Sequence, residues 1–370
     1  MPEHISLTEN ERLAWAAWAS IPYIGPKKIA LLRQAFPSLA DAWAATDTEV
    51  RTSLQREGKV TDAILKAKAA LVPEKNWQRL VDAGIRVITI LDHDYPRLLK
   101  ETHDAPAVLF LRGSLPPANQ LLLAVVGTRT CTDYGRKATA LIVEPLVRAG
   151  LGVISGLALG IDGLAHEAAL AAGGKTWAVM GTGLDTVYPP QHRDLAHRII
   201  EAGGGLLSEF PLQTKPLAQN FPLRNRIVSG MCLGTLVVEA GDKSGALLTA
   251  KLALDENREV FAVPGPITSD ASNGPHRFIR LGATLVRSTE DILAALNVTA
   301  PIESEPAAKT PPPADNPEEQ LVIQHLVAGA KHVDELSRLC DCDPSVTNAT
   351  LIMLELKGRV RHLGGLTYSL

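Results

Sequence analysis

The 370-residue chain has few aromatic side chains, few cysteines and almost no net charge. Aromatic residues make up 4% of it, too little for an extensive platform on which nucleic-acid bases could stack. The four cysteines are too scattered for a disulfide scaffold. The formal charge of −3 excludes a generally basic nucleic-acid coat but leaves room for a local basic patch.

Long apolar runs are also missing. No stretch approaches the roughly 18 residues that a bilayer-spanning helix needs, and no basic flank followed by an apolar run marks a signal peptide. A hydrophobic content of 46% with 21% charged residues is ordinary for a globular protein. We therefore expect a soluble cytoplasmic protein without membrane contact, with two or three domains at roughly 100–200 residues per domain.

Composition divides the chain into four segments. They are predicted as a helical domain at 1–75, an α/β core at 76–298, a Pro-rich linker at 299–317 and a winged-helix-like domain at 318–370. In the first segment, the turn Ile21–Pro26 followed by Lys27 and Lys28 resembles a helix-hairpin-helix, whose backbone amides can receive a DNA phosphate. An αα-hairpin that only packs on its neighbour is the alternative.

The last segment shows three helical patterns and then two β-like pieces around Gly364-Gly365, which is the outline of a winged helix. The third helical pattern begins at Asp343–Thr350 and has no Lys or Arg in the turns that normally contact bases in a DNA groove. This absence favours a protein-contact module over recognition of duplex DNA.

The middle segment alternates short apolar runs with helical stretches, from a strand expected at Val108–Leu111 to one at Thr284–Val286. The expected strands between them include Leu122–Val126, Thr176–Met180 and Gly205–Ser208, and one expected helix spans Arg224–Met231. Apolar strands that recur after crossover helices indicate a doubly wound, mostly parallel α/β sheet covered on both faces. Such sheets bind ligands beyond the carboxyl ends of their strands, near the point where the strand order reverses.

Several short motifs that would indicate catalysis or metal binding depart from their templates. Gly173–Thr176 looks like the end of a Walker A motif and Gly181–Thr186 like a dinucleotide-binding glycine run, but each has a wrong residue. Gly241–Gly245 has its serine in the wrong place for a nucleophile elbow, and Cys340-x-Cys342 has the wrong spacing for a zinc knuckle. His166, four residues after Asp162, is better explained as a side chain bonded near a helix start. The sequence therefore predicts no catalytic residue, no metal and no cofactor.

Gly- and Arg-bearing loops remain. Gly127 follows an apolar run and lets the backbone approach a ligand, while Thr128 offers a donor and Arg129 a fork suited to phosphate oxygens. If the sheet is doubly wound, three further loops share the same edge and complete an anion site. Their candidate residues are Ser155, Gly156 and Gly160; Phe221, Arg224, Asn225 and Arg226; and Lys243, Ser244, Gly245 and Thr249.

At these residues the sequence resembles the DNA-processing protein A (DprA/Smf) family. The matching strings cover about Ala105 to Leu296 in order; they include Val126-Gly127-Thr128-Arg129, Ser155-Gly156-Leu157-Ala158-x-Gly160-Ile161-Asp162, Gly181-x-Gly183-Leu184-Asp185 with Tyr188-Pro189, Phe221-Pro222-x-Arg224-Asn225-Arg226-Ile227 and Ser244-Gly245-Ala246-x-x-Thr249-Ala250. The first and last segments also resemble accessory domains of longer family members. The helical segment at 1–75 is similar to their SAM or helix-hairpin-helix domains, and the segment at 318–370 is similar to their winged-helix domain.

The resemblance implies an extended Rossmann-like core that binds single-stranded DNA, forms a homodimer and loads the RecA recombinase onto incoming strands in natural transformation. It implies no enzymatic activity. By position, the family's phosphate pocket carries over to the loops named above, from Gly127 to Thr249, with Phe221 as a stacking surface. We place the dimer contact around Phe278 and Ile279.

The alternative is a nucleotide-hydrolysing enzyme of the lysine-decarboxylase-like (LOG) type, whose core looks similar. Those enzymes carry a Pro-Gly-Gly-x-Gly-Thr-x-x-Glu string after a late strand, whereas this chain has Val237-Val238-Glu239-Ala240-Gly241. Glu239 alone, without a placed partner, is thin support for general acid catalysis.

Overall fold

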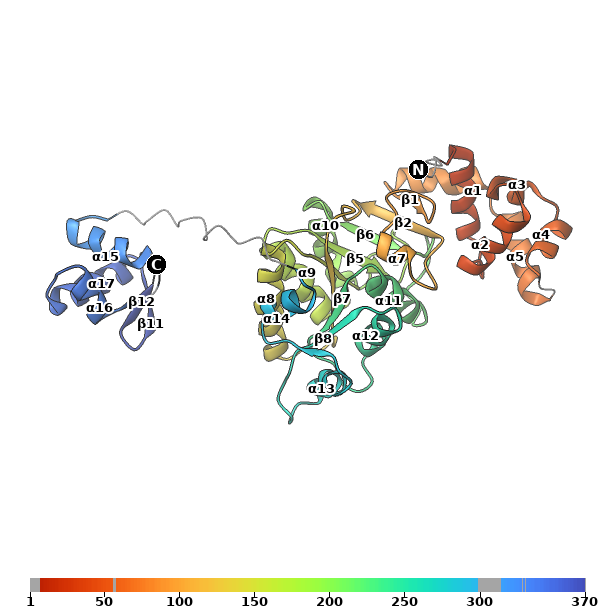
Figure 1. The fold of residues 1–370 in the computed structure, drawn as a ribbon. Coiled ribbons are helices and arrows are strands. Elements are labelled where there is room, and N and C mark those ends of the chain that lie inside the picture. The colour runs from red at the N-terminus through yellow and green to blue at the C-terminus, as the bar shows by residue number, and fades with distance from the viewer. Residues whose placement is uncertain (1–6, 56–57, 299–313, 328, 330, 370) are drawn as a thin grey trace. The chain divides into compact units, whose positions relative to one another are not determined.

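The computed structural model describes residues 7–55, 58–298, 314–327, 329 and 331–369 (Figure 1). The chain divides into two compact units, one up to residue 300 and one from residue 301. Most of the predicted linker at 299–317 lies outside the described residues. No helix within the described ranges is long and apolar enough to cross a membrane.

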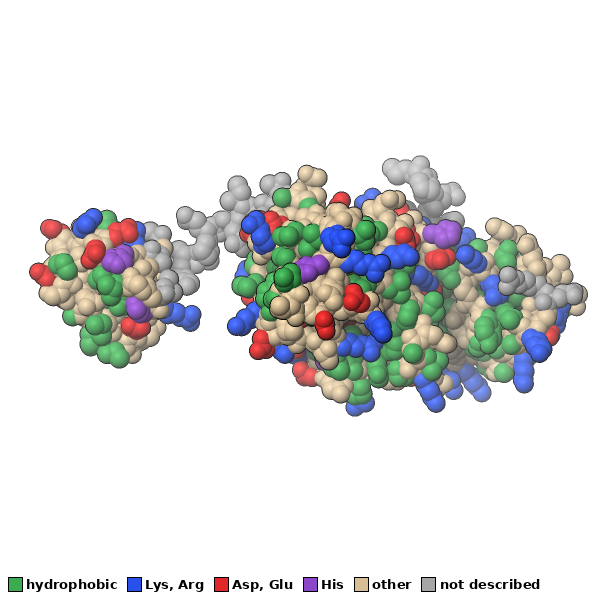
Figure 2. Space-filling model, turned by 90° about the horizontal axis from the view of Figure 1, so that it is seen from below, with side chains coloured by type: hydrophobic (Ala, Val, Ile, Leu, Met, Phe, Trp, Pro, Cys, Tyr) green, Lys and Arg blue, Asp and Glu red, His purple; other side chains and the backbone are tan. Residues whose placement is uncertain are grey.

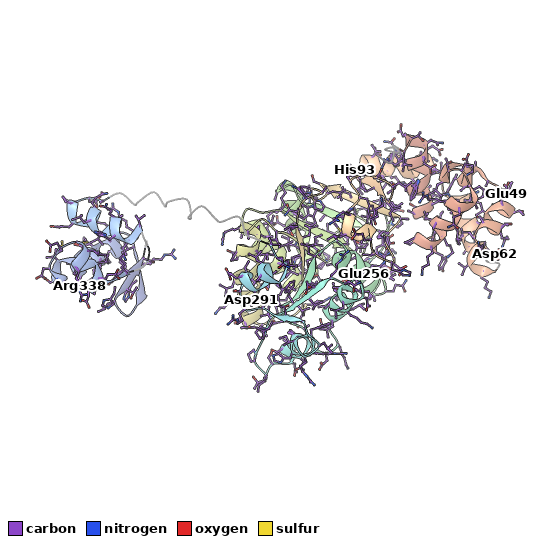
Figure 3. All side chains as sticks on the ribbon, viewed as in Figure 1. Glu49, Asp62, His93, Glu256, Asp291 and Arg338 are labelled. Carbon is purple, nitrogen blue, oxygen red and sulfur yellow. The ribbon has the colours of Figure 1, made fainter. Side chains whose placement is uncertain are left out.

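Six helices precede the sheet in the described part of the first unit: α1 (Glu9–Ala19), α2 (Pro26–Ala35), α3 (Leu39–Ala44), α4 (Asp47–Ser53), α5 (Lys59–Ala70) and α6 (Pro73–Asp82). Trp15 and Trp18 are fully buried between them. The Glu11 carboxylate accepts hydrogen bonds from the backbone N–H groups of Leu39 and Ala40, both at 2.9 Å, and so ties α1 to the start of α3. Figure 3 marks two outer positions, Glu49 on α4 and Asp62 on α5.

The first unit is built on a nine-stranded sheet with the order β1-β2-β6-β5-β4-β3-β7-β8-β9. The strands are β1 (Arg86–Thr89), β2 (Val108–Gly113), β3 (Leu122–Val126), β4 (Gly152–Ser155), β5 (Thr176–Met180), β6 (Gly205–Ser208), β7 (Gly234–Val237), β8 (Glu259–Ala262) and β9 (Thr284–Leu285). Across the sheet, from β6 through β5, β4, β3, β7 and β8 to β9, all neighbouring strands are parallel. The strand β2 runs antiparallel to both of its neighbours, β1 and β6. The predicted doubly wound, mostly parallel sheet is confirmed.

The chain starts the parallel sheet at β3, builds outward through β4, β5 and β6, and then returns to place β7 on the other side of β3. The strand order therefore reverses between β3 and β7. In sheets of this kind the loops at such a reversal diverge to opposite faces and leave a crevice at the carboxyl edge.

Helices cover both faces of this sheet (Figure 1). One face packs against α8 (Asp133–Arg148), α9 (Ile161–Ala171) and α14 (Thr289–Ala295), and the other against α11 (Asn220–Gly230), α12 (Gly245–Asp255) and α13 (Asn273–Arg280). Two further helices, α7 (Arg97–Lys100) and α10 (Arg193–Glu201), lie toward the β1–β2 side, where α10 joins the core of the N-terminal helices. The strands between them are buried on both faces, which explains their unbroken apolar runs.

The second unit has the three helices and the two β-strands that its sequence predicts, together with a short third strand, β10, that was not predicted. They are α15 (Pro317–Val327), α16 (Val333–Leu339) and α17 (Pro344–Leu356), with β10 (Lys331–His332), β11 (Arg361–Gly364) and β12 (Thr367–Ser369) in the order β10-β12-β11. Lys357 and Arg359 each form ion pairs with Asp315 and Glu319, which join the start of α15 to the end of α17. The winged-helix prediction is confirmed.

Candidate functional site

A groove of about 940 Å³ opens where the strand order reverses, at the carboxyl ends of β3 and β7. Eleven of the residues that the sequence singled out line it: Gly127, Thr128, Arg129, Gly156, Phe221, Arg224, Asn225, Lys243, Ser244, Gly245 and Thr249. They come from four separate loops and helix starts, and the topology of the sheet brings them together. Ser155, Gly160 and Arg226 do not line the groove, and their positions are described below.

The rim of the groove, by which we mean Arg129, Asn225 and Lys243, carries its accessible polar groups. Arg129 and Lys243 are exposed, and Asn225 is half-buried. The Asn225 side-chain amide donates to the Gly245 carbonyl at 3.4 Å, which links α11 to the start of α12. Ser244 caps α12 and accepts a hydrogen bond from the Ala246 N–H at 3.3 Å. Two exposed cations and a helix N-terminus in one groove suit an anionic ligand.

The turn that carries Arg129 is held by close backbone packing. The Thr128 N–H donates to the Glu239 carbonyl at 2.6 Å, and the Thr128 carbonyl accepts from the Ile161 N–H at 3.2 Å. Gly160 has a φ of +78°, and a Cβ there would lie 2.2 Å from the Thr128 carbonyl oxygen. Gly160 therefore acts from behind the groove, because only glycine lets these two loops meet.

The floor of the groove, by which we mean loop 155–160 with Asp162 and Arg224, is held by hydrogen bonds from these two buried side chains to the backbone. Arg224 is 4% exposed; its guanidinium donates to the Gly156 carbonyl at 2.6 Å and also to the Val179 carbonyl. The Asp162 carboxylate, 7% exposed, accepts from the N–H groups of Gly156 at 3.1 Å and Ala158 at 3.4 Å. A Cβ on Gly156 would lie 2.6 Å from the guanidinium. The N–H groups of Arg224 are thus mainly bonded within the protein itself.

Burial shapes the charges of this pair. It raises the pKa of Asp162, while the nearby Arg224 charge acts in the opposite direction. Burial also lowers the pKa of Arg224 to about 10, so the guanidinium stays charged at neutral pH. Two further side chains hold the same loop: Ser155 donates to the Val125 carbonyl at 2.6 Å, and a ring nitrogen of His192 lies 2.9 Å from the Leu157 carbonyl.

Phe221 stands between the rim and the floor. Its ring centroid lies 5.7 Å from the guanidinium carbon of Arg129, 5.9 Å from that of Arg224 and 5.6 Å from the ring centroid of Tyr188. A side pocket of about 40 Å³ opens beside it, lined in part by Arg129, Leu159 and Tyr188. Flat rings and cations at these distances attract one another and offer a surface for another flat ring. The sequence analysis did not propose Tyr188 as a site residue, although Tyr188-Pro189 was among the strings that carried the resemblance.

Arg226 points away from the groove. Its guanidinium makes two hydrogen bonds to the Glu209 carboxylate, at 2.6 and 2.7 Å. The reason is helical spacing: Phe221, Arg224 and Asn225 share one face of α11, whereas a residue two positions after Arg224 lies on another side. The same spacing, read from the sequence, would have separated Arg226 from its neighbours.

Acidic side chains limit the positive field of the groove. Asp162, Asp242 and Asp270 are among its lining residues, against the three cations Arg129, Arg224 and Lys243. On the face drawn in Figure 2, Lys and Arg side chains are likewise interspersed with Asp and Glu and form no continuous basic surface. Any attraction for an anion is therefore local and short-ranged.

The two candidate acid–base residues have structural partners. The Glu239 carboxylate accepts from the Thr132 N–H at 2.9 Å and from the Thr132 hydroxyl at 2.5 Å, at the start of α8. His166 is fully buried, with its Nδ1 2.7 Å from the Thr176 hydroxyl. Among the described residues, no group of three or more His, Cys, Asp or Glu side chains is placed to hold a metal ion.

The predicted dimer residues lie on α13 and do not line the groove, although Asn273 at the start of the same helix does. Phe278 is 6% exposed and packs in the core with β8, whereas Ile279 is half-buried. Their surroundings along the chain are more exposed: Ile267 is 91% and Leu281 67% accessible.

Comparison with known proteins identifies relatives of both units. The profile of the family described as DNA recombination-mediator protein A matches residues 86–297, and that of the DprA winged helix domain matches 306–365. "Protein Smf" of Escherichia coli (strain K12) is 50% identical over 202 residues, which are 55% of this chain and 54% of that protein. The chain thus matches about half the length of that relative.

Other relatives are covered more fully. "Protein Smf" of Synechocystis sp. is 38% identical over 294 residues, 78% of this chain and 74% of that protein. "DNA processing protein DprA" of Streptococcus pneumoniae is 45% identical over 208 residues, 56% of this chain and 72% of that protein.

Two solved structures resemble this chain. The crystal structure of DNA processing protein A from Streptococcus pneumoniae aligns with a TM-score of 0.65 at 33% identity and covers 78% of this chain and 98% of that one. DNA processing protein A from Helicobacter pylori, solved to describe its single-stranded DNA binding mode, aligns with a TM-score of 0.51 at 25% identity over 58% of this chain and 95% of that one.

Proposed function

Because the chain belongs to the DNA recombination-mediator protein A family, we propose that it binds single-stranded DNA in the groove between β3 and β7 and delivers the strand to the RecA recombinase in natural transformation. One observation carries the DNA part of this proposal: separate loops converge on one groove, with exposed Arg129 and Lys243 at its rim and Phe221 inside it. The Helicobacter pylori relative, whose structure describes single-stranded DNA binding, supports the same conclusion.

Each part of the groove has a place in this function. The rim cations and the start of α12 contact phosphates, which set the position of the strand without reading its sequence. Phe221 and Tyr188 offer their rings to a base. A base in a duplex is stacked and paired, so only a single strand presents one without an unpairing cost.

A groove with three cations and three acids binds with modest affinity. For a single strand the logarithm of the binding constant falls with the logarithm of salt concentration by about 0.7 per phosphate contact. We therefore expect a shallow salt slope for one groove. A homodimer would join two grooves on one continuous strand and raise the effective affinity without new contacts.

We propose that the dimer forms at the α13 side, where the sequence analysis placed it around Phe278 and Ile279. Phe278 itself supports α13 from within, since it is 6% exposed. The contact surface is supplied by Ile279 and by Leu281, which directly follows α13 and is 67% exposed. Exposed apolar residues that lie together are typical of protein interfaces.

We further propose that the chain is not an enzyme. Glu239, the general acid that the LOG-type alternative would need, is engaged in capping α8 through Thr132. Incubation of the protein with nucleoside monophosphates should release no free base. Released base would favour the enzyme.

The direct test compares binding of the full chain to oligo-dT and to a duplex of the same length. We expect clear preference for oligo-dT at every salt concentration.

A second assay measures how fast RecA coats a strand that is already covered by a single-strand binding protein, with and without this chain. Equal binding to duplex would contradict the DNA part, and an unchanged coating rate would contradict the delivery to RecA.

A further inference from the structure

Two exposed acidic side chains, Asp242 and Asp270, line the groove that we propose for DNA, and we call them the acidic edge. Among the ion pairs of the described residues, none includes either carboxylate. Asp242 accepts a hydrogen bond from the side-chain amide of Asn273 at 3.3 Å, a bond that a neutral amide oxygen could accept equally well. This contact therefore does not require a negative charge, while the two charges lower the affinity of the groove for any anion.

The acidic edge lies beyond two neighbouring strands. Asp242 follows β7 and Asp270 follows β8, whereas Arg129 follows β3. The strand order at this part of the sheet is β3-β7-β8. The loops after β7 and β8 are held against each other, because the Gly274 N–H donates to the Ala240 carbonyl at 2.8 Å. The fold thus places two uncompensated negative charges on the β7 and β8 loops and an exposed cation on the β3 loop of the same groove.

Duplex and single-stranded DNA place different amounts of charge on such a groove. A duplex carries one negative charge for about every 1.7 Å of its axis, whereas one of its strands carries one for about every 3.4 Å. A duplex is also stiff, with a persistence length of about 150 base pairs, so it lies across the mouth of the groove and cannot turn one backbone away. A single strand bends freely, and its phosphates can follow Arg129 and the start of α12.

We propose that the acidic edge makes the groove selective for single strands by repelling the second backbone of a duplex. The inference rests on the proposed function and adds to it the residues that reject the wrong form of DNA. Selectivity is a difference between two affinities, and a like charge placed against the unwanted partner increases that difference. The acids weaken binding of both forms, but the duplex loses more because its charge is denser and its backbones cannot move aside.

The test compares the full chain with D242N/D270N in fluorescence titrations with oligo-dT and with a duplex of the same length. At low salt the variant should bind duplex about fivefold more tightly and oligo-dT less than about twofold more tightly, as expected for two exposed charges. D242N and D270N alone should each give part of the gain. The gain should shrink as salt is raised, because salt screens exposed charges. Urea unfolding should show parent stability, since both positions are exposed.

The matched control is D255N/E259Q, which removes two negative charges elsewhere on the same unit. Asp255 ends α12 and Glu259 begins β8; both are exposed, and neither lines the groove. The 11 residues of α12 start at the groove with Gly245 and span about 16 Å, so its far end is well separated from the groove. The control shares the change in net charge and should leave the ratio of the two affinities at the parent value.

The outcomes separate this inference from the proposed function. A gain for duplex that is confined to D242N/D270N supports the inference. If the parent chain prefers oligo-dT but D242N/D270N leaves the ratio unchanged, raises both affinities equally or matches D255N/E259Q, only this inference is wrong. If the parent chain shows no preference for oligo-dT, the proposed function is wrong and the inference falls with it.

Discussion

The rim and the floor of the groove use the same residue type for opposite purposes. Arg129 on the rim and Arg224 in the floor lie at similar distances, 5.7 and 5.9 Å, from the Phe221 ring. Arg129 is exposed, whereas Arg224 is 4% exposed and binds two backbone carbonyls beside Asp162. The difference teaches that a positive charge near a ligand site does not by itself identify a residue that contacts the ligand. An exposed arginine is free to bind the ligand, whereas a buried arginine holds the loops of the site in place.

The largest effect is expected for Arg224→Ala. It leaves the buried carbonyls of Gly156 and Val179 without their donor, at about 1–3 kcal/mol for each in the free energy of unfolding, and it removes the positive charge that opposes the effect of burial on Asp162. The loss also frees loop 155–160, so binding to oligo-dT should fall with it. Urea unfolding of the variant measures the first effect and fluorescence titration the second.

The control is a double variant. Adding Asp162→Asn removes the stranded charge, so the pair of changes should cost less than the sum of the two alone. Arg129→Ala should stay within about 0.5 kcal/mol of the parent in the same assay. If Arg224→Ala and Arg129→Ala destabilise equally, the distinction between floor and rim fails.

Much of the groove was predictable because parallel strands leave strong signals. The apolar runs that became β3, β5 and β6 have the predicted bounds, and the loops after β3, β4 and β7 share the edge that a doubly wound sheet requires. The strand β1 was not predicted: its partner β2 lies beyond α7 in the chain, and an antiparallel edge strand of four residues gives little pattern of its own.

The sequence did not predict which arginine is exposed in the groove and which is buried or bound elsewhere in the protein. The sequence shows that Arg224 and Arg226 follow Phe221, but burial is set by where α11 begins. The predicted helix started at Arg224, whereas α11 starts at Asn220, so that Phe221 belongs to its first turn. Which arginine meets Glu209 and which meets Gly156 depends on contacts between distant segments.

Gly160→Ala should have the next largest effect. The residue has a φ of +78° and a ψ of −130°, a region in which side chains are strained by about 1–3 kcal/mol, and a Cβ would lie 2.2 Å from the Thr128 carbonyl. The turn that carries Arg129 must then move, and oligo-dT binding should drop. Gly173→Ala is the matched control, since its φ is +75° but no atom lies within 4 Å of its Cβ. Similar losses in both variants would mean that strain, and not the close approach of the two loops, explains the result.

A smaller effect is expected from pH, through His166 behind the floor. Burial lowers the pKa of His166 to about 3, and the charges of His192 and Arg224 act in the same direction. The unfolded chain takes up this proton near pH 6.5 while the folded chain resists it, so stability is full above pH 6.5 and falls toward pH 3 by up to about 1.4 kcal/mol per pH unit. Urea unfolding at pH 7 and pH 5.5 measures the slope. His166→Gln should reduce it, and an unchanged slope would assign it to other groups.

The smallest effect is expected for the rim, where Arg129→Ala should weaken oligo-dT binding by about 1 kcal/mol, roughly fivefold, without altering stability. If Arg129 contacts phosphate, as proposed, the loss should be the same for every base composition, and the salt slope should fall by about 0.7. Lys243→Ala should behave similarly, as it lies exposed on the other side of the groove. Arg193→Ala removes an exposed cation that does not line the groove and serves as the control. A change in base preference at constant affinity would place Arg129 against a base, and the rim would then read the strand as well as hold it.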